Sequence, residues 1–242
     1  MPAPRRRSLR GLWWVLLALA LVAAAWSAWE WRRWPDVARL AREDPKTTAF
    51  IEAWRAQQRT AGRSDSVEWR WVPYERISPH FKRAVLVAED IEFFSHHGFA
   101  FGEIETALAE AWQEKEMPRG ASTVSQQLAK NLWLSASRSP LRKWKEVLLT
   151  RELERRLSKR RILELYLNVV ELGPGCFGVE AGARRYFGHA ASELSEDEAA
   201  ALAASLPRPK DWHPGSPSRV YKRRVGIVLE RMTRAQFLWR VI

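Results

Sequence analysis

Residues 88–98 (AEDIEFFSHHG) bring three carboxylates, two aromatic rings and two histidines together in one short segment. A carboxylate beside aromatic rings has its pKa raised by desolvation, which suits a general acid or base near neutral pH. We expect Phe93 and Phe94 to supply that environment for Glu89, because residues 89 and 93 share a helical face. A solvated helix end is the alternative. A metal site is not indicated, since HExxH is absent and adjacent histidines seldom point the same way.

A second segment, residues 119–132 (RGASTVSQQLAKNL), predicts a loop that enters a helix. Free backbone N–H groups and hydroxyls at such a helix start can bind an anion. Val124, Leu128 and Leu132 form the expected buried stripe. The polar side chains that remain for hydrogen bonding are Ser122, Gln126, Gln127, Lys130 and Asn131. An N-capped surface helix without a ligand explains the same pattern.

A third segment is basic and consists of Arg138 followed by residues 141–146 (LRKWKE). Glu146 lies four residues after Arg142, which fits an exposed helix ion pair worth only about 0.3–0.5 kcal/mol. The same residues also fit a cationic wall for a diphosphate, with Glu146 held among the cations. Spacing alone does not choose between these interpretations.

An uncharged run near the N-terminus indicates a membrane segment. Gly11–Trp29 contains no charged residue, and as a helix it is about 28 Å long, close to the hydrocarbon thickness of a bilayer. Tryptophans lie near both ends, as is typical of membrane interfaces. A cleaved signal peptide is the alternative, but its apolar core is usually shorter and ends at small residues. We therefore predict a transmembrane anchor over residues 11–31.

Charged residues indicate orientation and partners. Arginines are denser before the uncharged run than after it, so residues 1–10 are expected in the cytoplasm and the rest of the chain on the other side. The net charge of +12 favours a phosphate-bearing partner, and the anchor argues against nucleic acid. Cys176 is the only cysteine, which excludes an intrachain disulfide and a cysteine metal cluster.

After the anchor, the pattern predicts a linker with short helical pieces over residues 32–66 and one mainly α domain over residues 67–242. Trp69–Pro73 alternates and is the only strand that we expect. The expected helices are 103–116, 122–134, a segment within 141–167 with apolar residues at helical spacing, and one that starts with a cap at 195–198.

Together these segments resemble the family-51 peptidoglycan glycosyltransferases. Residues 89–98 follow the family's ED-x-x-F-x-x-H-x-G motif, and residues 120–131 follow G-x-S-T-[IV]-[ST]-QQLAKN. Residues 142–146 follow RK-x-x-E, and residues 159–168 follow K-x-x-IL-E-x-YLN. The ending GV-x-x-A-A-x-x-YF is matched at Gly178, Val179, Ala183, Tyr186 and Phe187. The resemblance covers about residues 67–215. Ile91, Ala121 and Cys176 depart from the residues common in the family, and none of them replaces a candidate acid or Lys130.

The resemblance also indicates a subtype. Bifunctional relatives carry a transpeptidase domain with an S-x-x-K motif, and no serine here is followed three positions later by lysine. The sequence is similar to the monofunctional, membrane-anchored transglycosylases of Gram-negative bacteria. This implies a lysozyme-like, two-lobed domain that polymerises lipid II. In the reaction that the resemblance implies, the acceptor 4-hydroxyl attacks C1 of the donor, the α-linkage is inverted to β-1,4, and undecaprenyl diphosphate leaves.

The resemblance assigns roles to particular residues. It implies that Glu89 is the catalytic base and that Glu146 is a second catalytic residue near the donor diphosphate. The substrate-binding residues that it implies are Asp90, His96, Ser122, Gln127, Lys130, Asn131, Arg138 and Lys143. A divalent metal, Mg²⁺ or Mn²⁺, is compatible with the family, although no residue pattern here requires one.

The expected partners are lipid II, the growing glycan chain and the bacterial inner membrane, with the catalytic domain in the periplasm. Proteins of cell division or cell-wall synthesis are further candidates. Two other functions stay open, namely a membrane-anchored, lysozyme-like enzyme that cleaves the glycan and a non-catalytic scaffold of the division machinery. A cleaving enzyme needs no diphosphate site, so the basic segment favours synthesis.

Overall fold

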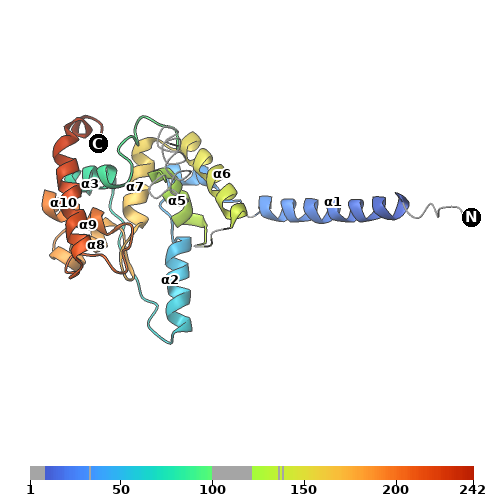
Figure 1. Ribbon diagram of the computed structural model, residues 1–242, viewed down its shortest axis with the longest axis horizontal. Coiled ribbons are helices and arrows are strands. Elements are labelled where there is room, and N and C mark those ends of the chain that lie inside the picture. The colour runs from blue at the N-terminus through green and yellow to red at the C-terminus, as the bar shows by residue number, and fades with distance from the viewer. Residues whose placement is uncertain (1–8, 33, 100–121, 136, 138) are drawn as a thin grey trace, which may run out of the picture. The chain divides into compact units, whose positions relative to one another are not determined.

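The computed structural model describes residues 9–32, 34–99, 122–135, 137 and 139–242. The chain divides into two compact units, Met1–Asp36 and Val37–Ile242. In the first unit, helix α1 spans Leu9–Arg32 (Figure 1). No helix among the described residues is long and apolar enough to cross a membrane. The predicted anchor is therefore not confirmed.

The second unit is mainly helical in its described part, as predicted (Figure 1). Its α-helices are α2 (Ala49–Thr60), α3 (Pro79–Glu89), α5 (Val124–Trp133), α6 (Pro140–Arg156), α7 (Lys159–Val169), α8 (Val179–Phe187), α9 (Glu196–Ser205) and α10 (Arg219–Arg234). Its 3₁₀ helices are η1 (Val37–Ala41), η2 (Tyr74–Arg76), η3 (Ala191–Glu193) and η4 (Gln236–Arg240). Its strands are β1 (Glu68–Trp69), β2 (Glu171–Gly173) and β3 (Cys176–Phe177).

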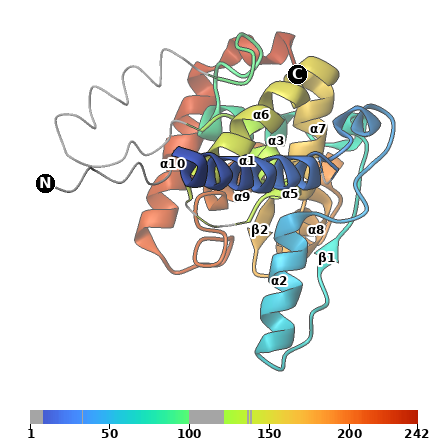
Figure 2. The same cartoon turned by 90° about the vertical axis from the view of Figure 1, so that its right-hand side faces the viewer.

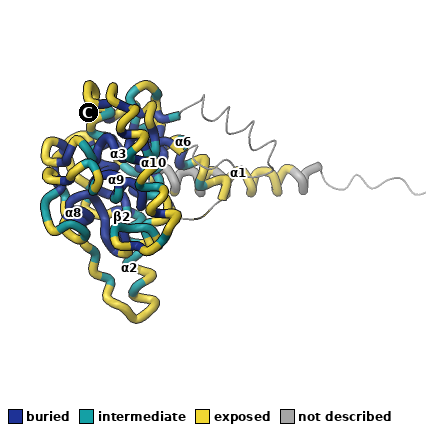
Figure 3. Tube along the Cα trace, turned by 60° about the vertical axis from the view of Figure 1, so that its left-hand side comes forward, coloured by how far each residue is buried: buried dark blue, intermediate teal, exposed yellow. Residues whose placement is uncertain are grey.

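The helices of this unit pack in two groups. One group consists of α3, α9 and α10, which all contact one another, and the other places α6 and α7 against α5. Figure 1 shows the two groups side by side. Helix α2 packs on α5 and lies next to it in Figure 2. The buried residues gather inside this unit (Figure 3). The two-lobed, lysozyme-like arrangement stays a prediction.

Two of the helix starts show why the sequence folds in this way. Ser195 and Glu198 form the predicted capping box at the start of α9, and Thr123 and Gln126 form another at the start of α5. Such reciprocal bonds satisfy backbone N–H groups that a helix leaves free. The helical pattern over residues 141–167 is interrupted after Arg156, and Ser158 caps a new helix, α7. The helix expected at 103–116 lies outside the described residues.

The prediction of a single strand is wrong. The strands β1, β3 and β2 form one sheet in that order, with β1 parallel and β2 antiparallel to β3. Strands of two or three residues are too short to produce an alternating pattern. Gly175, between β2 and β3, has a φ of +69°, and a Cβ there would lie 2.6 Å from the Trp54 ring. This tight connection therefore requires glycine.

Residues 37–66, which the sequence analysis assigns to a linker, lie within the second unit. Val37 and Leu40 of η1 are buried, and Ile51 of α2 is fully buried. Arg161 of α7 fastens this segment, since its guanidinium donates to Leu40 O at 2.7 Å and to Asp44 at 2.8 Å. The mainly polar composition of this segment did not indicate that it packs on the domain, because only one arginine and a few apolar residues make the contacts.

Candidate functional site

Glu89 lies where the two groups of helices meet. It is the last residue of α3, and its side chain is 13% exposed. Its Oε2 accepts a hydrogen bond from Gln127 Nε2 of α5 at 2.8 Å. Its Oε1 pairs with Arg224 Nη2 of α10 at 3.2 Å. Both carboxylate oxygens are therefore oriented by side chains that come from different helices.

Burial raises the pKa of Glu89, and the interactions with Gln127, Arg224 and Lys130 oppose this shift. The sequence predicted a raised pKa, but the local reason that it gave is wrong. Because α3 ends at Glu89, residues 89 and 93 do not share a helical face. Phe93 lies in the following turn, with its ring centroid 5.1 Å from that of Phe94.

Tyr166 fixes the orientation of the Gln127 amide, on the side of the amide opposite Glu89. The Tyr166 hydroxyl donates to Gln127 Oε1 at 2.8 Å. Complete burial raises the pKa of Tyr166 far above its ordinary value, so the phenol stays protonated and acts as a donor. With Oε1 occupied in this way, the amide N–H₂ group must face Glu89. Tyr166 and Gln127 are thus positioning residues for the Glu89 carboxylate.

Asp90 and His96 hold the loop after α3 against the start of α5. Asp90 Oδ2 accepts from the Val124 N–H at 2.9 Å, and His96 Nε2 lies 2.9 Å from Asp90 Oδ1. The Gly98 N–H donates to His96 Nδ1 at 3.0 Å. Since Nδ1 accepts, the proton of a neutral ring sits on Nε2 and is donated to Asp90. These side chains shape the surroundings of Glu89 through the backbone.

The start of α5 was predicted to offer free backbone N–H groups to an anion, but three of these groups are engaged within the protein. The N–H of Thr123 donates to Gln126 Oε1, that of Val124 to Asp90, and that of Gln126 to Thr123 Oγ1. Thr123 Oγ1 also donates to Gly98 O at 2.8 Å. The bonds to Asp90 and Gly98 join α5 to the loop after α3, and the bonds between Thr123 and Gln126 close the cap, so the N–H groups of these three residues are not available to an anion.

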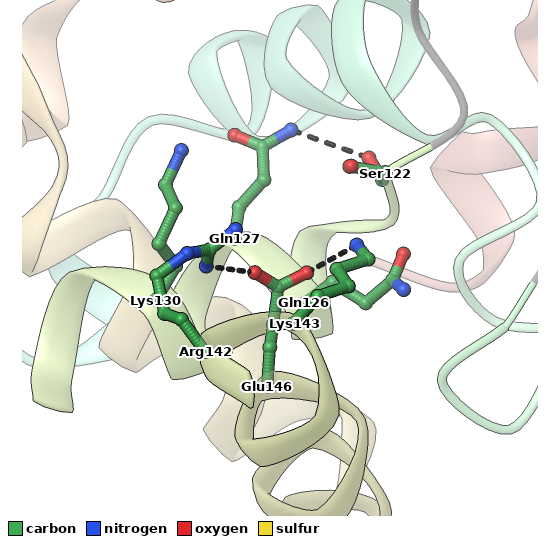
Figure 4. A pocket seen from close by; sticks show the side chains of 7 residues that line it. All are labelled: Ser122, Gln126, Gln127, Lys130, Arg142, Lys143 and Glu146. Carbon is green, nitrogen blue, oxygen red and sulfur yellow. Dashed lines mark hydrogen bonds and ion pairs between the residues drawn. The ribbon is translucent and has the colours of Figure 1, made fainter. Parts of the chain in front are cut away.

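A polar pocket opens between the start of α5 and the first turns of α6 (Figure 4). Glu89 adjoins it through its hydrogen bond with Gln127. Its lining residues are Ser122, Gln126, Gln127, Lys130, Arg142, Lys143 and Glu146. Glu146 is buried, and its two oxygens accept from Arg142 and Lys143, each at 2.5 Å. The exposed ion pair that spacing alone allowed is excluded, because Glu146 is enclosed between two cations.

Lys130 is the cation between the two candidate acids. Burial lowers the pKa of its ammonium, while the nearby carboxylates of Glu146 and Glu89 raise it. Its Nζ lies 5.5 Å from the centroid of the Phe50 ring of α2 and forms no hydrogen bond or ion pair with another described residue. Lys130 is therefore a half-buried positive charge that can bind an anionic ligand.

The structure brings most of the predicted site residues together. Ser122, Gln127, Lys130, Lys143 and Glu146 line the pocket, and Glu89 adjoins it through Gln127. Asn131 is buried and is not part of the lining. Arg138 lies outside the described residues. The catalytic and binding roles themselves stay predictions.

Sequence reasoning missed three contributors. Arg142 was considered only as an ion-pair partner of Glu146. Tyr166 was part of a matched motif but was given no role, and Arg224 was not considered. The position of Arg142 one helical turn before Glu146 could have indicated that it lines the same pocket. Arg224 is 135 residues from Glu89 in the chain, and no local pattern connects the two. The Nε atoms of Arg142 and Arg224 are buried and have no hydrogen-bond partner among the described residues.

The side chains at the pocket do not fit a metal held by protein ligands. Among the described residues, no group of three or more histidine, cysteine, aspartate or glutamate side chains converges. The oxygens of Glu146 are engaged by Arg142 and Lys143, and those of Glu89 by Gln127 and Arg224. The described pocket side chains therefore offer no unengaged carboxylate to a protein-held metal.

Comparison with known proteins shows the family of the chain. The family model described as transglycosylase matches residues 56–233. The chain belongs to the transglycosylase family, and the resemblance drawn from its motifs is confirmed.

Relatives named biosynthetic peptidoglycan transglycosylase resemble the chain over most of its length. The protein from Thiobacillus denitrificans is 46% identical over 189 residues, 78% of this chain and 82% of the relative. That from Methylobacillus flagellatus is 40% identical over 228 residues, 94% of this chain and 99% of the relative. That from Aromatoleum aromaticum is 47% identical over 209 residues, 86% and 89% of the two chains.

The Arg224 contact predicts a pH effect. Arg224 lowers the pKa of Glu89, so Arg224→Met should raise it. A base works only when ionised, and kcat/KM falls as the pH drops through the pKa of that base. We expect the acid limb of the kcat/KM profile to move to higher pH in Arg224→Met. Arg223→Met removes the neighbouring, exposed charge and serves as the control. If the acid limb of the kcat/KM profile lay at the same pH in both variants, the effect of Arg224 on the pKa of Glu89 would be contradicted.

Proposed function

We propose that this protein is a peptidoglycan glycosyltransferase that polymerises lipid II into β-1,4 glycan strands, with inversion and without transpeptidase activity. One observation carries the proposal, namely a largely buried carboxylate, Glu89, beside a pocket lined by Lys130, Arg142 and Lys143. The names of the relatives support the same substrate. Lipid II and the growing glycan chain are then the two ligands.

In the proposed reaction, Glu89 accepts the proton of the acceptor sugar's 4-hydroxyl as that oxygen bonds to C1 of the donor. The bond between C1 and the diphosphate oxygen breaks, and its electrons leave with the diphosphate. Gln127 and Tyr166 hold the carboxylate in place. A preorganised base contributes about 100- to 10,000-fold to such a reaction.

The pocket cations act on the leaving group. Negative charge grows on the diphosphate oxygen as the bond to C1 breaks, and cations already in place stabilise that charge most. Lys130 has no competing partner among the described side chains, and Arg142 retains a buried Nε–H without an acceptor there. Glu146 keeps Arg142 and Lys143 close together despite their mutual repulsion. Glu146 therefore organises the diphosphate site instead of serving as a second base.

A lysozyme-like enzyme that cleaves the glycan is not favoured. It would also use one enclosed glutamate, but it would have no leaving diphosphate and no need for a pocket of cations. The test is to incubate the full chain with lipid II alone and to resolve the products by size. Polymer supports the proposal, whereas lipid II left intact beside cleavage of preformed glycan supports the lytic enzyme. No reaction with either substrate supports the scaffold.

We infer a location at the bacterial inner membrane for this protein. A lipid-linked substrate requires a catalytic domain at the membrane, and the uncharged run Gly11–Trp29 supports an anchor in the bacterial inner membrane. The arginines before it support a periplasmic domain. Carbonate extraction of bacterial membranes tests this, and release of the full chain into the supernatant would contradict an integral anchor. Division or cell-wall synthesis proteins stay predicted partners.

A further inference from the structure

Helix α2 brings an aromatic ring to a cation of the pocket. The helix packs on α5, and the Nζ atom of Lys130 lies over the Phe50 ring, 5.5 Å from its centroid. An ammonium within about 6 Å of a ring centroid is attracted by the negative face of the π system. Phe50 does not line the pocket itself. It can therefore affect a bound ligand only through Lys130.

The position of Phe50 is fixed by its neighbours on α2. The hydroxyl of Thr48 caps this helix by accepting a hydrogen bond from the Ile51 N–H at 3.1 Å, and the Ile51 side chain is fully buried. One turn after Phe50, the Trp54 ring packs on the tight connection at Gly175. Residues 50 and 54 share a helical face, so the contacts that hold Trp54 in place also hold Phe50 against α5.

The charge of Lys130 depends on the groups that surround it. Burial lowers the pKa of this ammonium, whereas the carboxylates of Glu146 and Glu89 raise it. The Phe50 ring acts in the same direction as the two carboxylates, because its π face favours the charged form of the amine. Unlike a carboxylate, the ring has no oxygen that would compete with a ligand for the N–H donors of the ammonium. A ring at this position thus supports the charge and leaves the donors for the ligand.

We propose that Phe50 is a positioning residue of the diphosphate site, whose ring holds the Lys130 ammonium by a cation–π contact and leaves its N–H donors to the ligand. The identity of the ligand rests on the proposed function, whereas the contact between ring and ammonium does not. The family model matches residues 56–233, and Phe50 lies before that range. The contribution therefore comes from the segment that the sequence analysis assigned to a linker.

The experiment replaces Phe50 by progressively fluorinated phenylalanines in the full-length protein. Fluorine withdraws electrons from the ring and weakens its attraction for a cation, while the shape of the side chain changes little. Competitive acetylation measures the pKa of Lys130, since only the neutral amine reacts, and mass spectrometry follows the acetylation of each lysine as a function of pH. Lys222, an exposed lysine of α10, is the internal control.

We expect the pKa of Lys130 to fall with each added fluorine, because the charged form loses stabilisation. A cation–π contact of ordinary strength predicts about two- to fivefold faster acetylation of Lys130 at a pH below its pKa once the ring has lost its negative face. Lys222 should not change. Binding of undecaprenyl diphosphate should weaken in the same order. Phe50→Leu should resemble the most fluorinated variant, and Phe50→Tyr, which keeps the ring, should resemble the unchanged protein.

Two results would overturn the proposal. One is a pKa of Lys130 that stays the same across the fluorinated series. The other is a Phe50→Leu variant that binds undecaprenyl diphosphate as tightly as the unchanged protein at every pH. The acetylation measurement needs no substrate, so a fluorinated series that lowers the pKa of Lys130 in a protein that fails to polymerise lipid II would refute only the proposed function.

Discussion

Replacement of Glu89 by glutamine is expected to lower the rate of lipid II polymerisation by about 100- to 10,000-fold. Glutamine keeps the shape of the side chain and can still accept the hydrogen bond from Gln127 Nε2, which now reaches Glu89 Oε2 at 2.8 Å. What it loses is the ability to take a proton from the attacking hydroxyl. The loss should therefore appear in kcat, with a smaller change in KM.

The fold of Glu89→Gln should survive. Burial raises the folded-state pKa of Glu89, so ionisation of this group costs stability as the pH rises from its unfolded pKa to its folded pKa. Glutamine removes that cost at neutral pH, while the pairing with Arg224 is lost. A melting curve and a polymerisation gel measure both properties together. Glu92→Gln, at an exposed position three residues on, is the control, and near-normal glycan synthesis by Glu89→Gln would disprove its role as base.

The sequence predicted the site better than it predicted the surroundings of the site. Glu89, Gln127, Lys130 and Glu146 were found because each lies in a local motif whose spacing is recognisable. The prediction that Glu146 could sit among cations is confirmed by its contacts with Arg142 and Lys143. What local spacing could not decide was burial, which depends on the packing of α6 against α5 and α7.

The failures have a common physical reason. Arg224 reaches Glu89 across the contact between α10 and α3, and Arg161 fastens η1 from α7. Both interactions join residues more than 100 positions apart, and a pattern within one segment carries no information about them. The prediction of strands failed for another reason. A strand of two or three residues is too short to show a recognisable alternation of apolar and polar residues. The helices α5, α6, α7 and α9 were predicted, because each is capped and long enough to show its spacing, whereas α3, α8 and α10 were not among the expected helices.

Replacement of Lys130 by methionine is the second large effect that we expect. Methionine keeps an unbranched apolar stem in the space near Phe50 and removes the charge. Cations placed before reaction at a developing negative charge are worth about 100- to 1,000-fold in rate. We expect turnover of lipid II to fall by that order, together with binding of undecaprenyl diphosphate.

Lys130→Arg separates charge from shape. Arginine retains the positive charge in a bulkier, planar form, so part of the activity and of the diphosphate binding should return. Lys46→Met, at an exposed lysine outside the pocket, controls for the change in net charge. If Lys130→Met lost turnover but bound the diphosphate lipid as tightly as the unchanged protein, Lys130 would act on Glu89 instead. Its ammonium is electrostatically coupled to both Glu89 and Glu146, and this measurement separates the two roles.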